Sequence, residues 1–167
     1  MSERGWGVAV AALAVAAAAC SPELDWREVR SEPGRFVAVL PGKPRLEERQ
    51  LYGRPGMVMH LWSARAGKAL YGVGYADAPR ADASLVPSTR DALTANIGGR
   101  LVSDREIVVG TARGREFTAE GPKVTLMARV LLADHRLYQV ALVAKKGEVD
   151  SAAADTFFSS FRLAAPQ

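Results

Sequence analysis

Two neighbouring apolar segments, 124–133 and 136–145, limit the possible folds of this chain more than any other feature. They flank Asp134-His135 and predict two strands joined by a tight turn. Successive side chains of a strand point to opposite faces, and here apolar residues fall on both faces. Strands of this kind lie centrally in a sheet that is covered on both sides. The residues concerned are Val124, Leu126, Met127, Val130, Leu131, Leu132, Leu137, Tyr138, Val140, Leu142 and Val143.

The rest of the pattern predicts further strands, two helices and a single domain. Pro87 suits the first turn of a helix that begins at about 84 or 87, and Gly98-Gly99 would end it after 96 or 97. A last helix over 148–161 carries an apolar stripe. The other strands are expected at 36–40, 46–52, 57–65, 68–76, 101–109 and 115–120, with a turn over 110–114. We therefore expect an α+β domain over 26–163, with a central antiparallel β-sheet flanked by helices on both faces as an α/β/α sandwich.

The segments 57–65 and 68–76 read as a hairpin around Ala66-Gly67, which places Trp62 opposite Tyr71. One face of this hairpin carries aromatic rings, and the other carries two glycines that would form a flat floor for a helix or a ligand. Packing beneath a helix is the commoner reason for such a surface. The candidate binding face consists of Trp62, Tyr71, Gly72, Gly74 and Tyr75.

The N-terminal segment contains the chain's single cysteine, Cys20, directly after the apolar run 5–19. Ala18-Ala19-Cys20 resembles the lipobox of bacterial lipoproteins, which implies a signal peptide over 1–19, acylation of Cys20 and a tether over 20–25. Ala17 stands where that family usually has leucine, and Ala17-x-Ala19 also satisfies an ordinary signal-peptidase site. A third possibility is an uncut membrane anchor, although a spanning helix needs about 20 strongly apolar residues.

Export would place the domain on the periplasmic side, attached to the membrane through its N-terminal lipid. Ser21 follows the cysteine where aspartate, by resemblance to enteric lipoproteins, favours the inner membrane, so the outer membrane is favoured here. A lone cysteine cannot form an internal disulfide. The net charge of +4 comes from dispersed basic residues, with Lys145-Lys146 among the largest local groups. We therefore expect an envelope protein as partner and no nucleic acid.

Three segments carry a second resemblance. The strand 36–40 that ends in Pro41-Gly42-Lys43-Pro44, the meander through 138–140 and the closing segment 157–163 together resemble the PsbP-like superfamily. That group includes the photosystem PsbP proteins, a Ran-binding branch and DcrB-like exported proteins. The resemblance implies an antiparallel sheet between helices and no shared catalytic residues.

No pattern in the sequence predicts catalysis, a cofactor or a metal. His60 lies on the aromatic face and His135 in a predicted turn, far apart in sequence. Gly72-Val73-Gly74 lies within a strand, where no phosphate loop forms. We therefore expect a lipid-anchored envelope protein that acts as a non-catalytic binding or assembly accessory. The alternatives are a periplasmic carrier of a small molecule and, third, a hydrolase.

Overall fold

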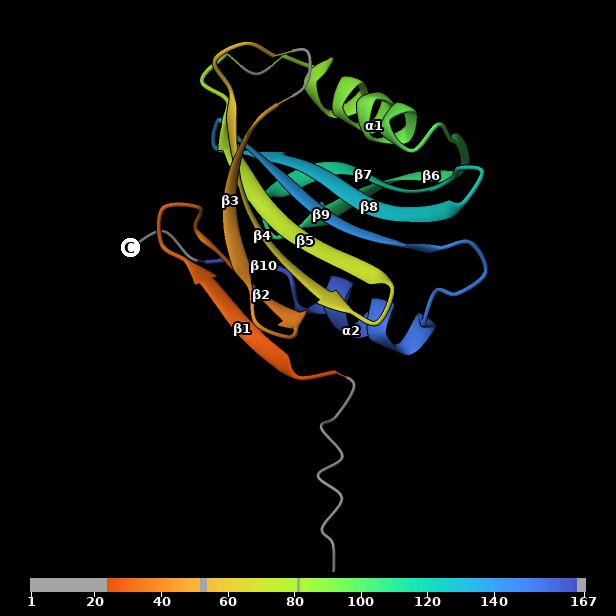
Figure 1. Cartoon of the computed structure of the whole chain (residues 1–167). Helices are drawn as coiled ribbons and strands as arrows, with labels where there is room; N and C mark the ends of the chain where they lie inside the picture. Colours follow the sequence, from red (N-terminus) through yellow and green to blue (C-terminus); the bar gives the residue numbers. More distant parts are fainter. Residues whose placement is uncertain (1–23, 52–53, 81, 165–167) are drawn as a thin grey trace, which may run out of the picture.

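The computed structural model describes residues 24–51, 54–80 and 82–164. Its elements form two antiparallel sheets and two helices (Figure 1). In chain order they are β1 (Trp26–Ser31), β2 (Phe36–Pro41), β3 (Arg45–Gln50), β4 (Val58–Ala66), β5 (Ala69–Asp77), α1 (Leu85–Asn96), β6 (Arg100–Val109), β7 (Ala112–Glu120), β8 (Val124–Ala133), β9 (Arg136–Lys145), α2 (Ser151–Ser160) and β10 (Arg162–Leu163).

The larger sheet has the strand order β3-β4-β5-β9-β8-β7-β6. As predicted, β8 and β9 are interior strands, paired from Val124–Lys145 to Ala133–Arg136. Asp134 and His135 form the turn between them with φ of 48° and 58°. Positive φ at both central residues is what a two-residue type I′ hairpin requires.

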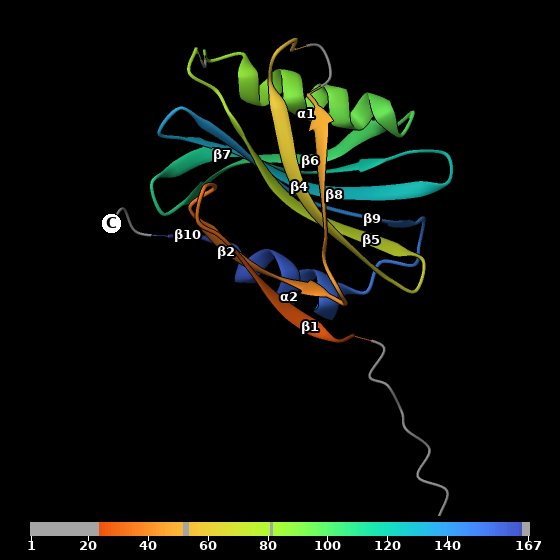
Figure 2. The same ribbon diagram turned by 60° about the vertical axis from the view of Figure 1, so that its left-hand side comes forward.

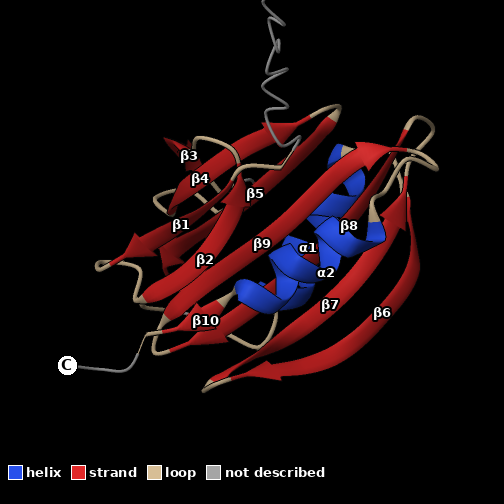
Figure 3. Cartoon of the chain, turned by 90° about the horizontal axis from the view of Figure 1, so that it is seen from below, coloured by secondary structure: helices blue, strands red, loops and turns tan. Residues whose placement is uncertain are grey.

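The two faces of the larger sheet are covered by different elements (Figure 2). α1 packs over β6, β7 and β8, in a cluster that includes Leu85 and Phe117. The opposite face packs against α2 and against a separate sheet of order β1-β2-β10. Figure 3 shows α2, β1 and β2 on the same side of the larger sheet. The domain is thus richer in strands than the expected sandwich, because β1 and β2 pair with each other instead of leaving that face to a helix.

The β4–β5 hairpin differs from its predicted register by two residues. Gly67 has φ of +54° and takes the first central position of the turn, where a type II′ turn requires glycine. The turn is therefore Gly67-Lys68, and Trp62 pairs with Val73 instead of Tyr71. A shift of two leaves each side chain on its predicted face.

Two other boundaries also moved. β7 begins at Ala112, so the turn expected over 110–114 shortens to Gly110-Thr111, with Gly110 at φ +60°. α2 begins at Ser151 and not at 148, because the Asp150 carboxylate accepts a hydrogen bond from the Ala153 amide and caps the helix there.

The larger sheet is open at both edges. Its edge strands are β3, with the sequence RLEERQ, and β6, with the sequence RLVSDREIVV. Both strands carry charged residues of both signs, and almost all of β3 is exposed.

Candidate functional site

Cys20, the predicted lipidation site, lies outside the described residues together with the segment before it. The first described residue is Leu24, which packs against the core beneath α2 and the small sheet. The folded domain therefore begins within four residues of Cys20. None of the helices in the described part of the chain has the length and apolar character needed to cross a membrane.

The predicted aromatic face lies inside the core. Tyr71 and Tyr75 are only 2% and 6% exposed. Phe36 of β2 packs edge-on against Trp62, with 5.5 Å between ring centroids, and also contacts Tyr75. Phe157 of α2 meets the Tyr71 ring edge-on at 5.2 Å. These rings join the two sheets and α2, and they do not form an open binding face.

The predicted glycine floor is occupied by the neighbouring strand. A Cβ added to Gly74 would lie 2.4 Å from the backbone oxygen of His60, and one added to Gly72 would lie 3.3 Å from Cδ1 of Leu61. The atoms nearest to both added groups belong to β4. The two glycines serve close packing between strands and leave no room for a ligand.

Each of the two histidines has a local environment of its own. The His60 ring stacks on Tyr75 at 4.9 Å, and its Nδ1 lies 3.2 Å from the Glu48 carboxylate. His135 is exposed in the β8–β9 turn. Within residues 24–51, 54–80 and 82–164, no three His, Cys, Asp or Glu side chains gather as a metal site would require.

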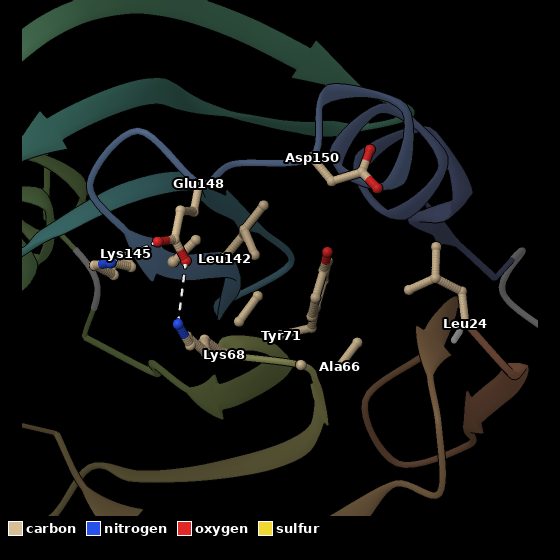
Figure 4. A pocket seen from close by; sticks show the side chains of 11 residues that line it. Leu24, Ala66, Lys68, Tyr71, Leu142, Lys145, Glu148 and Asp150 are labelled. Carbon is tan, nitrogen blue, oxygen red and sulfur yellow. Dashed lines mark hydrogen bonds and ion pairs between the residues drawn. The ribbon is translucent and has the colours of Figure 1, made fainter. Parts of the chain in front are cut away.

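A pocket of about 390 Å³ lies between the tip of the β4–β5 hairpin and the start of α2 (Figure 4). We call it the Leu24 pocket, because Leu24 forms one wall. Its volume falls within the range of small ligand sites, about 300–1,000 Å³. The lining residues are Leu24, Ala66, Gly67, Lys68, Ala69, Tyr71, Leu142, Ala144, Lys145, Glu148 and Asp150.

The charges of the Leu24 pocket lie on its rim. Lys145 Nζ donates a hydrogen bond of 2.6 Å to Glu148, and Lys68 Nζ lies 3.9 Å from the same carboxylate. The hydrogen bond from Lys145 lowers the pKa of Glu148. Burial, and then the nearby Asp150 carboxylate, raise the pKa of Tyr71, so its hydroxyl stays protonated at neutral pH. A protonated phenol can donate a hydrogen bond to a group held in the pocket.

A second polar cluster joins α1 to the sheet. Asp104 of β6 accepts hydrogen bonds from Arg115 of β7, at 2.7 Å, and from Arg90 of α1, at 2.5 Å. Burial on its own raises the pKa of Asp104, but the hydrogen bonds and charges of Arg115 and Arg90 outweigh it and lower the pKa overall. Sequence reasoning missed this cluster, because the three residues meet only once the β6–β7 register and the position of α1 are fixed.

Asp104→Asn is expected to lower the free energy of unfolding at pH 7 by about 1 kcal/mol, since both arginines lose a charged acceptor while the shape is kept. The folded-state pKa of Asp104 lies below its ordinary value of 3.8. Its contribution is therefore complete above that value and is lost as the pH falls through the lowered pKa. Urea unfolding at several pH values should show the two proteins converging in acid.

Glu106→Gln is the matched control, because Glu106 is 88% exposed and lies 3.5 Å from Arg115. Its unfolding midpoint should match that of the unmodified protein at every pH. An Asp104→Asn variant that stays less stable by the same amount at all pH values would contradict the assignment.

Comparison with known proteins supports the fold. No family model matches the chain, and no curated protein matches it. Among solved structures, the chain is similar to cyanobacterial PsbP (CyanoP) from Synechocystis, with a TM-score of 0.59 and 11% identity over 83% of this chain and 92% of that one. A protein of unknown function from Pseudomonas aeruginosa gives a TM-score of 0.39 at 11% identity, over 74% of this chain and 85% of that one. The likeness to CyanoP shows that this chain has a PsbP-like fold.

Proposed function

We propose that this chain is an exported, lipid-anchored envelope protein that acts without catalysis as a binding or assembly accessory. One observation carries the proposal: the folded domain begins within four residues of Cys20, directly behind a lipobox-like apolar segment. Four extended residues span at most about 14 Å, so acylation of Cys20 would hold the domain against the bilayer. Ser21 favours the periplasmic side of the outer membrane.

Metabolic labelling with a palmitate analogue should label the wild-type protein and leave the Cys20→Ala variant unlabelled, because acylation needs the thiol. Ala17→Leu, which restores the usual leucine of the lipobox, should label at least as strongly as the unmodified protein. A cleaved but unlabelled protein would indicate ordinary secretion, and an uncleaved, unlabelled protein would indicate a spanning anchor. Either result would overturn the lipid anchor.

A periplasmic carrier of a small molecule is the second candidate, and the Leu24 pocket is the observation that favours it. The predicted residues Gly72, Gly74, Trp62 and Tyr75 do not support it, because they pack inside the domain. Crosslinking in solubilised membranes separates the two functions. Reproducible recovery of a protein partner supports the accessory, whereas recovery of a small molecule alone supports the carrier.

A further inference from the structure

α1 covers only part of one face of the larger sheet. One end of that face has no described helix over it. α1 packs mainly over β6, β7 and β8, and so leaves the ends of β5 and β9 accessible. A groove of about 650 Å³ lies there. Its floor is apolar and partly exposed, and it is formed by Leu70, Val124 and Val143 with Pro122 and Ala144.

Five cationic side chains surround this floor. They project from the β4–β5 hairpin, the β7–β8 turn and the end of β9, and within the described part of the chain no acidic residue lines the groove. We call it the lysine groove. Its cationic residues are Arg65, Lys68, Lys123, Lys145 and Lys146, all of them exposed.

Two of the five cations are partly neutralised from outside the groove. Lys145 pairs with Glu148, and Lys146 Nζ lies 3.0 Å from Glu120. Lys68 has only the 3.9 Å contact to Glu148. Arg65 and Lys123 form no ion pair with any described residue. The groove therefore keeps an excess of positive charge beside an apolar floor.

The lysine groove adjoins the Leu24 pocket, because Lys68, Ala144 and Lys145 line both. Leu24 is also where the described chain begins, four residues after Cys20. The cationic end of the domain is thus the end at which the described chain begins.

We propose that the lysine groove is a docking surface for the anionic headgroups of a lipid bilayer. Phosphate groups match the ring of cations, and the glycerol and upper acyl region matches the apolar floor. Each basic residue near an anionic membrane is worth about 1 kcal/mol, which is roughly a five-fold change in binding. The groove would orient the anchored domain with its hairpin tips against the membrane. This orientation rests on the proposed lipid anchor, whereas binding of the groove to anionic headgroups does not.

The test measures binding of the full chain carrying Cys20→Ala to vesicles of 30% phosphatidylglycerol in phosphatidylcholine and to pure phosphatidylcholine. Without the thiol no acyl chain contributes. We expect binding to the anionic vesicles at low salt that falls steeply as salt is raised. Adding Lys68→Glu and Lys123→Glu should weaken it by at least about 25-fold, the product of two five-fold losses.

The matched control carries Arg80→Glu and Arg113→Glu, an equal change of charge at exposed positions that do not line the groove. It should keep most of the binding. Equal loss in both double variants would mean that only net charge matters, and equal binding to neutral vesicles would mean that the apolar N-terminal segment dominates. Either result would overturn the proposal that the lysine groove docks on anionic lipid headgroups. The palmitate experiment tests the anchor independently. If the wild-type protein is labelled but the Cys20→Ala protein does not bind anionic vesicles, the lipid anchor stands and the proposed role of the lysine groove is wrong.

Discussion

Gly114→Ala is expected to lower the free energy of unfolding by about 3 kcal/mol or more, the upper end of what overpacking a core costs. A Cβ at Gly114 would lie 1.9 Å from the backbone oxygen of Val130 and 2.8 Å from Cα of Leu131. Both obstructing atoms are backbone in the central strand β8, so no side-chain rotation can relieve the clash. Urea unfolding, or loss of soluble protein during expression, would record the effect.

Gly72→Ala is the matched control, because it adds the same methyl group to an interior strand of the same sheet. The nearest atom is Cδ1 of Leu61 at 3.3 Å, at the end of a flexible side chain. We expect a loss of at most about 1 kcal/mol, since a small rotamer adjustment makes the space. Similar losses in the two variants would contradict the view that β7 and β8 approach too closely at Gly114 for any side chain.

Phe36→Ala is expected to cost about 3–5 kcal/mol, the usual range for removing a buried phenylalanine ring. Phe36 is fully buried in β2 and contacts rings from the larger sheet and from the segment after α2. Those rings are Trp62, Tyr75, Tyr138 and Phe161. The cavity would therefore open between the two sheets, and thermal unfolding should show a strongly lowered midpoint.

Leu46→Ala is the comparison for Phe36→Ala, because Leu46 is also an apolar strand residue but is 56% exposed on the edge strand β3. Its unfolding midpoint should change little. If Phe36→Ala were equally mild, the small sheet would not be held to the larger one by this ring.

The sequence predicts the centre of the sheet better than its periphery. β8 and β9 were predictable because their two-sided apolar pattern and the short turn at Asp134-His135 are local signals. The β4–β5 register was off by two residues, because both candidate turns contain Gly67 and only the backbone shows which position the glycine takes. The pairing of β1 with β2, away from the larger sheet, depends on which surface the rest of the chain leaves uncovered.

The same distinction applies to the candidate sites. Cys20 stands out because its whole signal lies in one short segment. The lysine groove does not, since Lys68, Lys123 and Lys145 are dispersed in the sequence and come together only when two hairpin turns and the end of β9 meet at one end of the sheet. The aromatic and glycine residues could be either a surface or part of the core, because only the folded chain brings Phe36 against the rings and β4 against the glycines.

The two open edges of the larger sheet matter when many copies of the domain are anchored on one membrane surface. Lipid anchoring would confine the domains to two dimensions, where collisions between edges become frequent. Backbone groups on unpaired edges favour sheet-to-sheet growth, and charged side chains along an edge oppose it. Arg45, Glu47, Glu48 and Arg49 on β3, with Arg105 and Glu106 on β6, provide that opposition. If the proposed anchor holds the domain at a membrane, these edge charges would oppose edge-to-edge pairing at high surface density without the sheet closing into a barrel.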